Sequence, residues 1–541
     1  MVLLTVPALV PLLRVGFFQS HDGLIHVYRL AALDGAVRSG VLYPRWFPHF
    51  AFGYGHPVLN FYGPLSYYWG LPFTLLHADA ALALKLVLAM GLVASALGMY
   101  LFARLHLDRC PALVAAVVYA YLPYHLVDLY VRGAVAEFLA FVWFPLVLWS
   151  FHRLITGAAQ PGLQRLALAA LLFAALVATH SLSAFIFAPL MAVYIVLLLL
   201  QERNSRATAS VVLASGLALA VSAAHWLPVL VEAQWVGLGH GTSQGYQEHL
   251  VSWTALVSLH PFYPYPSGEG TAPTFPLGLI QILTIAAALL LLFRRGQSQR
   301  PSRWMIWLFL ALALFSAFML TTASLPVWRV FEWGLAFLQY PWRFQALTAL
   351  AAAFLAGALV QGMTPLPRQG APSSRTTAAI CAGFLVATGV WALWRLPVVP
   401  MTADPSTEAM WQRDREVGQV GATWTGEYLP IWVTEQRWAL SHPTSGDTAT
   451  GTDTERGPYP PGQVKLASVG YTRYDLVLNA AEEVSVALHQ FHYPGWQAED
   501  LDGNMVYDSQ PAGILGLAAF ELPPGDGSFA LRLALTPAQL W

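Results

Sequence analysis

Charged residues are scarce in this sequence. Only 11% of its 541 residues are charged and 57% are hydrophobic, whereas about 25% of the residues of a soluble globular chain are charged. This composition excludes a water-soluble enzyme. The formal net charge of −1 gives no general attraction to nucleic acid, so we expect no nucleic-acid partner.

Cysteine is nearly absent as well. Cys110 and Cys381 form neither a C-x-x-C pair nor a Cys/His spacing typical of metal sites. Their small number excludes a disulfide framework and a zinc knuckle.

Long apolar stretches take the place of the missing charges. A helix needs about 20 apolar residues to cross a bilayer core. The stretches of this kind are 1–18, 82–103, 111–127, 137–152, 164–180, 183–200, 207–231, 276–293, 304–322, 346–362 and 377–395. The first has no basic segment and no small-x-small cleavage site, so we expect it to be retained. The sequence predicts a polytopic α-helical membrane protein with about eleven transmembrane helices.

The loops between these stretches alternate in charge. With the N-terminus inside, the inner loops hold twelve arginines and two acids, and the outer loops hold nine acids. The positive-inside rule therefore predicts a cytoplasmic N-terminus and an extracytoplasmic C-terminus. We expect a multi-pass protein of the cytoplasmic (inner) membrane.

The C-terminal region, 397–541, differs from the transmembrane core at 1–396. It contains 18 of the 29 acids and 7 of the 28 basic residues. Period-2 alternation, which is typical of half-buried strands, occurs at 464–466, 474–478, 484–488 and 529–535. Turn-forming residues lie at 494–495, 502–504 and 523–527, and a Thr/Gly/Pro-rich stretch at 441–462 indicates a flexible loop. We predict an extracytoplasmic domain resembling a β-sandwich.

The long first outer loop, 19–81, starts with Asp22 close to the predicted membrane face. An ionisable group at that depth is costly unless it pairs or lines a wet cavity. Asp22 could accept a proton from an attacking hydroxyl or bind a divalent cation, and the alternative is a helix N-cap. His26 follows at i, i+4 and would share the helix face of Asp22, although a packed histidine is the commoner outcome.

A second ionisable cluster includes Arg132 and Glu137, in the short outer turn between the third and fourth stretches. Glu137 opens an otherwise apolar helix, and a charged carboxylate facing lipid would cost about 2.5 kcal/mol or more at mid-depth. We therefore expect it to face the protein interior. Arg132 is a natural partner for Glu137 or for a phosphate, and an interfacial ion pair without further function is the alternative.

Further polar candidates lie at the predicted outer ends of other stretches. Arg343 is suited to bidentate phosphate binding and equally to snorkelling toward headgroups. His180 ends the fifth stretch. Tyr54 and His56 belong to the stretch 53–68, which lacks a phosphate-loop pattern. An interfacial or re-entrant segment is favoured there, and stacking of a sugar ring is the alternative.

Several of these motifs together resemble the bacterial membrane protein family labelled "6-pyruvoyl-tetrahydropterin synthase-related". They are His21-Asp22-Gly23, Tyr43-Pro44-Arg45-Trp46, Gly53-Tyr54-Gly55, Arg132-Gly133, Ala136-Glu137-Phe138, Thr179-His180, Tyr340-Pro341-Trp342-Arg343 and Glu427-Tyr428-Leu429-Pro430. The arrangement of core, first outer loop and C-terminal domain resembles the GT-C class of membrane glycosyltransferases, and YfhO-like membrane proteins more distantly. The family label implies no pterin chemistry, because the three-histidine zinc site of the soluble synthase has no counterpart here.

The GT-C resemblance implies transfer of a sugar from a polyprenyl-phosphate-linked donor to an extracytoplasmic glycan, lipid or protein acceptor, in contact with membrane lipid. Asp22 matches the acid that acts as base or metal-linked residue, and Glu137 is a second candidate catalytic acid. Both are also candidate ligands of a divalent metal ion. The resemblance makes Arg132, Arg343, His26, Tyr54, His56 and His180 candidate substrate-binding residues. GT-C enzymes often carry two adjacent acids, whereas His21 precedes Asp22 here.

Two other functional classes compete with the glycosyltransferase. A transporter or flippase of lipid-linked glycans would carry inverted repeats and broken helices near the membrane midplane. No repeat is evident, and the ionisable residues cluster toward one face, which favours the enzyme. A noncatalytic envelope scaffold would keep the fold without bringing Asp22 and Glu137 to one cavity.

The predicted orientation can be tested with inserted reporters. We expect a reporter within 294–303 to read as cytoplasmic and one after residue 400 to read as extracytoplasmic, because the arginine-rich loops stay inside. Fusions to alkaline phosphatase and to green fluorescent protein measure this. Both positions on the same side would contradict the eleven-helix topology.

Overall fold

The computed structural model describes most of the chain in nine segments, with a few isolated residues between 379 and 440. The segments are 2–157, 162–238, 245–258, 275–293, 301–363, 398–423, 426–435, 464–500 and 505–539. They form two compact units. The first is Met1–His26, Ala81–Ser222 and Gln244–Ala403, and the second is Val27–Ala80, Ala223–Ser243 and Asp404–Trp541. The second unit thus combines parts of the predicted core with the C-terminal region, and the assignment of domains at 1–396 and 397–541 stays a prediction.

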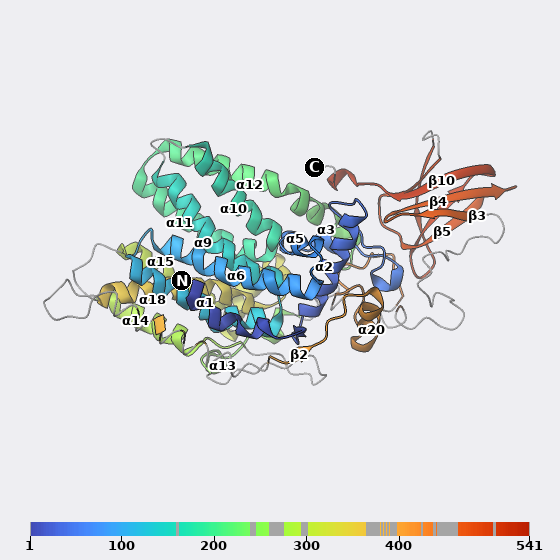
Figure 1. Ribbon diagram of the computed structural model, residues 1–541. Helices are drawn as coiled ribbons and strands as arrows, with labels where there is room; N and C mark the ends of the chain where they lie inside the picture. The colour runs from blue at the N-terminus through green and yellow to red at the C-terminus, as the bar shows by residue number, and fades with distance from the viewer. Residues whose placement is uncertain are drawn as a thin grey trace. The chain divides into compact units, whose positions relative to one another are not determined.

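The first unit is a bundle of apolar helices (Figure 1). Its longer elements are α1 (Val2–Leu9), α6 (Ala80–Ala103), α7 (Arg109–Tyr121), α9 (Val135–Thr156), α10 (Leu163–Thr179), α11 (Ser181–Glu202), α12 (Ser205–Glu232), α14 (Leu279–Phe293), α15 (Arg303–Met319) and α18 (Gln345–Met363). Helix α12 belongs to this unit as far as Ser222 and to the second unit from Ala223 on. Shorter ones are η1 (Val10–Leu13), α8 (Pro123–Val127), η3 (Asp128–Arg132), α13 (Trp253–Leu256), α16 (Leu325–Val330), α17 (Glu332–Leu335) and η8 (Pro341–Phe344).

The helices confirm a polytopic α-helical membrane protein. Within the described residues, five helices are long and apolar enough to cross a membrane, or six if the bent pair Arg109–Tyr121 and Pro123–Arg132 is one span. Four shorter apolar helices coincide with further predicted stretches. The stretch 377–395 lies outside the described residues apart from isolated positions, so the number of eleven stays a prediction.

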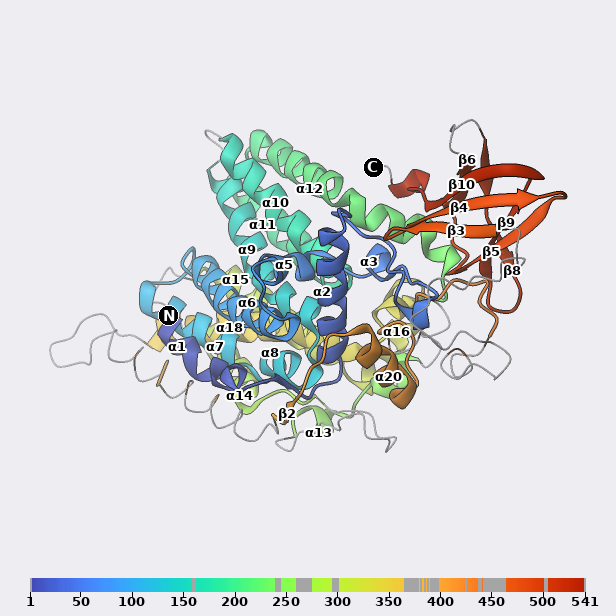
Figure 2. The ribbon, with the colours of Figure 1, turned by 45° about the vertical axis from the view of Figure 1, so that its right-hand side comes forward.

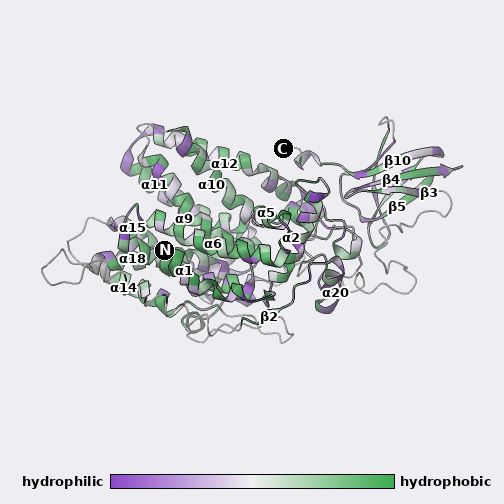
Figure 3. Cartoon of the chain, viewed as in Figure 1, coloured by the Kyte–Doolittle hydropathy of each residue, from purple (hydrophilic) through white to green (hydrophobic). Residues whose placement is uncertain are grey.

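Helix α18 is the centre of this bundle. It packs against α7, α14 and α15, while α9 packs against α10 and α11. In the apolar span Pro341–Gly362, which contains most of α18, 89% of the residues in the most apolar stretch are buried. In the span Ser205–Trp235, which contains α12, only 33% are buried. Figure 3 shows hydrophobic colour along the long helices. The alanine-rich sequence of α18 lets neighbouring backbones approach closely, which is how helices associate in lipid.

The first apolar stretch is shorter as a helix than expected. The prediction of a helix over 1–18 is wrong after Leu13, because Arg14 takes an extended conformation and β1 (Phe17–Phe18) pairs with β2 (Pro400–Met401). Hydropathy alone does not distinguish a short apolar strand from the end of a helix. Twelve helical residues span only about 18 Å at the usual rise, against a bilayer core of roughly 30 Å.

The second unit contains the β-rich C-terminal region and short helices. The helices are α2 (Gly23–Arg38), which begins in the first unit, η2 (Ala51–Gly53), α3 (Val58–Phe61), α4 (Leu65–Tyr68), α5 (Leu71–Leu75) and α20 (Thr407–Val417). The strands are β3 (Val464–Val469), β4 (Arg473–Ala480), β5 (Val484–Phe491), β6 (Trp496–Asp500), β7 (Val506–Asp508), β8 (Gln510–Ala512), β9 (Leu517–Leu522) and β10 (Gly525–Leu533). Three of the four predicted alternating runs fall within strands. The fourth, 529–535, extends two residues beyond β10, and the predicted turn at 523–527 overlaps the first three residues of that strand.

The strands form two antiparallel sheets, drawn in red and orange in Figure 2. One has the order β3-β4-β10-β6-β7 and the other β5-β9-β8. Side chains alternate in burial along β4 and β5, and the inward residues of both sheets belong to one hydrophobic core. Trp46 and Tyr54 from the first long loop join this core, so residues remote in sequence complete the β-rich region.

A buried carboxylate joins several segments of the second unit. Glu232 is fully buried and accepts hydrogen bonds from Asn60 Nδ2 at 2.6 Å, Tyr493 Oη at 2.7 Å and Gln539 Nε2 at 3.0 Å. The Thr536 hydroxyl donates to its other oxygen. Replacing this carboxylate would leave buried donors without an acceptor.

We expect Glu232→Gln to lower the free energy of unfolding of the second unit by about 1–3 kcal/mol, because hydrogen bonds to a charged group are replaced by donor–donor contacts. Hydrogen–deuterium exchange of β5 and β10 measures this loss. Glu521→Gln is the matched control, since Glu521 is exposed on β9. Equal protection in the two variants would contradict a stabilising role for Glu232.

Candidate functional site

The candidate site of the first unit begins at a break in a helix. Leu122 is extended and Pro123 starts α8, so α7 and the following helical segment meet at a 43° bend. The segment then tightens into a π-helical turn, η3, and ends at Gly133 with φ +63°. Single π-helical turns are rare and occur frequently at functional sites. Here the turn brings Asp128 and Arg132 together as a buried ion pair.

Glu137 is the residue on which the cluster converges. It lies in the first turn of α9, with a side chain only 3% exposed. Its Oε1 accepts a hydrogen bond from the Tyr124 hydroxyl at 2.6 Å. Its Oε2 lies 3.0 Å from Arg132 Nη1 and 3.4 Å from Arg343 Nε. Glu137 thus pairs with both buried guanidinium groups, and Asp128 is a second carboxylate for Arg132, as the low-dielectric surroundings require.

Arg132 is held on several sides. Its Nη1 donates to the Tyr124 hydroxyl at 2.9 Å, besides pairing with Asp128 and Glu137. Its guanidinium carbon also lies 6.0 Å from the ring centroid of Trp342, within reach of a cation–π attraction. Arg132 therefore fixes the geometry of the cluster.

Arg343 is less completely satisfied than Arg132. It sits in η8 between Trp342 and Phe344, is 9% exposed, and lies over the Tyr340 ring at 5.5 Å. Within the described part of the chain, its Nε and Nη1 atoms make no hydrogen bond, although Nε is ion-paired with Glu137. Buried polar groups normally have a hydrogen-bond partner, so these N–H groups can donate to a further, anionic ligand.

Asp22 is attached to the same cluster through its backbone. The His21 amide donates to Val131 O at 2.9 Å, and the Asp22 amide donates to Arg132 O at 2.7 Å. The charge of Asp22 acts electrostatically on Arg132. The segment that begins the first loop is therefore fastened to the π-helical turn, and two residues that the sequence placed on separate loops lie near one another.

Gly133 makes this attachment possible. A Cβ atom there would lie 2.7 Å from the Gly23 amide nitrogen and 2.6 Å from Ser20 Oγ. The position also has a left-handed backbone, which disfavours other residues. Close approach and positive φ thus both require glycine.

The histidines predicted as substrate ligands have different surroundings. His180 lies between α10 and α11, contacts Ser183 Oγ through Nδ1 at 2.6 Å, and acts electrostatically on Glu137. His26 is buried in the first turn of α2, and its amide donates to Asp22 O at 3.3 Å. His180 thus belongs to the cluster, and His26 lies one turn after Asp22.

Tyr54 and His56 belong to the second unit. The Tyr54 ring stacks on His489 at 4.4 Å and on Phe491 at 5.0 Å between centroids, and only 5% of the residue is exposed. His56 is fully buried, and this desolvation lowers its pKa to about 3. Within the described residues, neither of its ring nitrogens has a hydrogen-bond partner. Both residues therefore pack into the interior of that unit.

Sequence reasoning missed Tyr124 and Asp128 as members of the site. Asp128 is fully buried and pairs with Arg132, and Tyr124 bridges Arg132 and Glu137. The i, i+4 spacing of Asp128 and Arg132 was an available signal for an ion pair. Nothing in the sequence indicated the Tyr124 contact, because it depends on the bend at Pro123.

The apolar bundle, its buried ion-pair cluster and the β-rich C-terminal region define a polytopic membrane protein. A family model matches residues 59–395, more than half of the chain. The protein belongs to this family of membrane proteins, described as the 6-pyruvoyl-tetrahydropterin synthase related domain, which confirms the resemblance found in the sequence. A search of curated proteins gave no match.

Solved structures with a similar chain path include two transferases. The arabinofuranosyltransferase AftD from Mycobacteria matches with a TM-score of 0.48 and 17% identity, over 76% of this chain and 28% of that one. The Archaeoglobus fulgidus oligosaccharyltransferase in the apo form matches with a TM-score of 0.41 and 14% identity, over 76% and 57%. The same oligosaccharyltransferase has also been solved with Zn and sulfate. This chain thus spans less than two thirds of the length of either protein.

The prediction of a divalent metal site at Asp22 and Glu137 stays a prediction. Within the described residues, no three His, Cys, Asp or Glu side chains gather in a way that could hold a metal ion. The Glu137 oxygens face Tyr124, Arg132 and Arg343, which is an environment of donors and positive charge. These residues do not fit a cation at Glu137.

We expect Gly133→Ala to release the Asp22 segment from the π-helical turn, because its new Cβ would collide with the Gly23 backbone. Hydrogen exchange of the His21 and Asp22 amides should accelerate at least tenfold, the effect of about 1.4 kcal/mol. Gly418→Ala is the control, since Gly418 has φ +68° but nothing within 4 Å of its Cβ position. Unchanged exchange at His21 and Asp22 would contradict the role assigned to Gly133.

Proposed function

We propose that the protein is a membrane glycosyltransferase that moves a sugar from a polyprenyl-phosphate-linked donor to an extracytoplasmic acceptor. The observation that carries this proposal is the Arg343 guanidinium, which is buried beside Glu137 and has Nη1 without a hydrogen bond to any described residue. A phosphate oxygen would satisfy such donors with charge-assisted hydrogen bonds. Arg343 is thus the candidate group for the donor phosphate.

Glu137 acts in this proposal as a positioning residue. Its Oε1 already accepts from the Tyr124 hydroxyl and its Oε2 faces Arg132 and Arg343, so it is poorly suited to take up a further proton. By compensating both arginines it keeps Arg343 buried and correctly oriented. This proposal gives Glu137 a positioning role in place of the role in the sequence prediction, in which Glu137 was a second catalytic acid.

Asp22 is then the candidate general base. Its backbone amide donates to Arg132 O, which brings this acid close to the cluster. In the reaction, Asp22 removes the proton of the acceptor hydroxyl, and the acceptor oxygen attacks the anomeric carbon. The bond from that carbon to the donor phosphate oxygen breaks, and polyprenyl phosphate leaves with the electron pair beside Arg343.

The remaining predicted substrate-binding residues have lesser roles in this proposal. His26 and His180 are candidate contacts to the substrate because they lie one turn after Asp22 and beside Glu137. Tyr54 and His56 are assigned to packing in the second unit. We place the reaction at the outer face of the cytoplasmic membrane, with an inner N-terminus, and route no step through a cation.

We expect Asp22→Asn to lower the rate of sugar transfer by about 100-fold or more, because general-base catalysis typically contributes 10²–10⁴-fold. The protein in proteoliposomes is given undecaprenyl-phosphate-linked monosaccharides, and mass spectrometry measures the undecaprenyl phosphate released. Asp79→Asn serves as control, since Asp79 is an exposed acid of the same predicted loop. Expression and thermal stability should match the wild type in both variants.

Wild-type transfer by Asp22→Asn would overturn the role of Asp22 as base. Movement of the intact donor across the bilayer without release of undecaprenyl phosphate would favour the transporter instead. If the wild-type protein shows neither transfer nor transport although its ion-pair cluster is intact, the result would favour the noncatalytic scaffold.

We expect Arg343→Ala to raise the KM for the lipid-linked donor by about 10–100-fold, because a hydrogen bond to a charged group is worth about 1.5–3 kcal/mol. Arg343→Lys should recover part of this loss, since it keeps the charge but not the planar pair of donors. Arg329→Ala is the control, because Arg329 is exposed in the preceding segment. An unchanged KM in Arg343→Ala would contradict phosphate binding there.

A further inference from the structure

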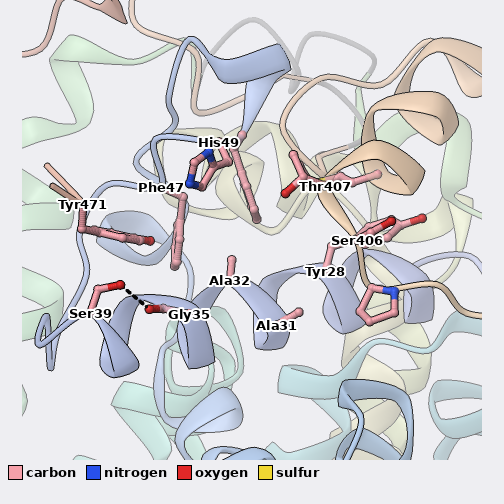
Figure 4. A pocket seen from close by; sticks show the side chains of 13 residues that line it. Tyr28, Ala31, Ala32, Gly35, Ser39, Phe47, His49, Ser406, Thr407 and Tyr471 are labelled. Carbon is pink, nitrogen blue, oxygen red and sulfur yellow. Dashed lines mark hydrogen bonds between the residues drawn. The ribbon is translucent and has the colours of Figure 1, made fainter. Parts of the chain in front are cut away.

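The second unit contains a cavity that the proposed reaction does not use. It lies between α2, the loop at 47–50 and the N-terminus of α20, and its volume is about 270 Å³ (Figure 4). All its lining residues belong to the second unit. Ligand pockets range over about 300–1,000 Å³, so this cavity is of a size for one small ligand or one unit of a longer chain.

Small residues of α2 form one wall. Ala31, Ala32 and Gly35 line the cavity and follow one another on the helix in Figure 4. A Cβ atom at Gly35 would meet nothing within 4 Å. The absence of a side chain therefore leaves open space on this face of the helix, which a ligand could occupy.

Aromatic rings form the opposite side. Phe47 and Phe50 are stacked, with centroids 5.0 Å apart and an interplanar angle of 24°. In Figure 4 the Tyr471 ring and the Phe47 ring stand above the α2 wall, with His49 beside them. Aromatic side chains with one polar end provide a flat apolar surface together with a hydrogen-bonding group.

The polar groups of the cavity are uncharged hydroxyls and one imidazole. Ser39, Ser406 and Thr407 contribute hydroxyls. Burial raises the pKa of Tyr28 to about 12, so this phenol keeps its proton and remains a donor, as in its 3.4 Å contact with Ala409 O. No Asp, Glu, Lys or Arg is among the lining residues, so the cavity has no charged side chain of these types to pair with a charged ligand.

We propose that this cavity binds a single neutral sugar unit, such as one residue of a glycan. A sugar ring has an apolar face of C–H groups, which fits the Phe47 and Tyr471 rings, and a rim of hydroxyls, which fits Ser39, Ser406 and Thr407. The absence of Lys and Arg from the lining favours a neutral sugar over a sugar phosphate or nucleotide. The inference does not depend on Asp22 or on the proposed transfer, because it concerns binding alone.

Ligand-observed saturation-transfer NMR on the full chain in detergent tests this site. The probes are methyl α-D-mannopyranoside, methyl β-D-glucopyranoside and methyl α-D-arabinofuranoside, with glucose 1-phosphate and cyclohexanol as comparison compounds. We expect at least one neutral glycoside to receive saturation from the protein. Gly35→Leu, which fills the open space, should weaken that binding at least fivefold.

Gly216→Leu is the matched control, because Gly216 is also a helical glycine with nothing within 4 Å of its Cβ position, and it lies in α12 of the first unit. It should bind the glycoside like the wild type, and so should Asp22→Asn, which separates this proposal from the transfer reaction. The proposal is overturned if no neutral glycoside binds up to tens of millimolar. It is equally overturned if Gly35→Leu binds as well as Gly216→Leu, or if glucose 1-phosphate or cyclohexanol binds more tightly than the glycosides.

Discussion

The carboxylate of Glu137 is the constraint on which the first unit depends. Two guanidinium groups buried among apolar helices would each cost several kcal/mol without a counterion. Glu137 faces both Arg132 and Arg343, so the start of α9, the π-helical turn and η8 have to meet at one place. The contacts of the Asp22 backbone with the same turn then connect the first loop to this polar layer. Fold and candidate site therefore rest on the same ion pairs.

In the proposed function the two acids have different roles. Enzymes distinguish carboxylates by their surroundings, since a group surrounded by donors and positive charge holds its charged state while another remains available for proton transfer. Glu137 has the first kind of surroundings, because Tyr124, Arg132 and Arg343 occupy its oxygens. Asp22 contacts the cluster through its backbone amide and acts electrostatically on Arg132, and we propose it as the base. The sequence analysis made Asp22 the first candidate acid and Glu137 a second candidate, and the contacts of Glu137 now favour a positioning role for it.

Much of the architecture was predictable because hydropathy and alternation are local signals. They located the apolar helices and the strands around 474–478 and 484–488. Arg132, Glu137 and Arg343 all lie at the predicted outer ends of apolar stretches. Because an isolated charge at that depth in the membrane is costly, the sequence already indicated that they lie together. The remaining features depend on contacts between distant residues. Asp128 and Tyr124 join the cluster through a π-helical turn and a proline bend, and Trp46 donates to Gln490 Oε1 at 2.7 Å across more than four hundred residues. Periodicity carries no information on such partners, so the composition of the second unit could not be foreseen.

The two units differ in the kind of ligand that each can stabilise. The cluster of the first unit is charged, and Arg343 offers buried donors that suit an anion. The cavity of the second unit has no charged lining residue and combines aromatic faces with hydroxyls, which suits a neutral polar ligand. In the proposed transfer the leaving group is an anionic lipid phosphate, and the buried donors of Arg343 suit such a group. The cavity takes no part in that step, so a neutral sugar unit can bind there whether or not transfer takes place. Transfer and sugar binding therefore depend on different residues of this chain.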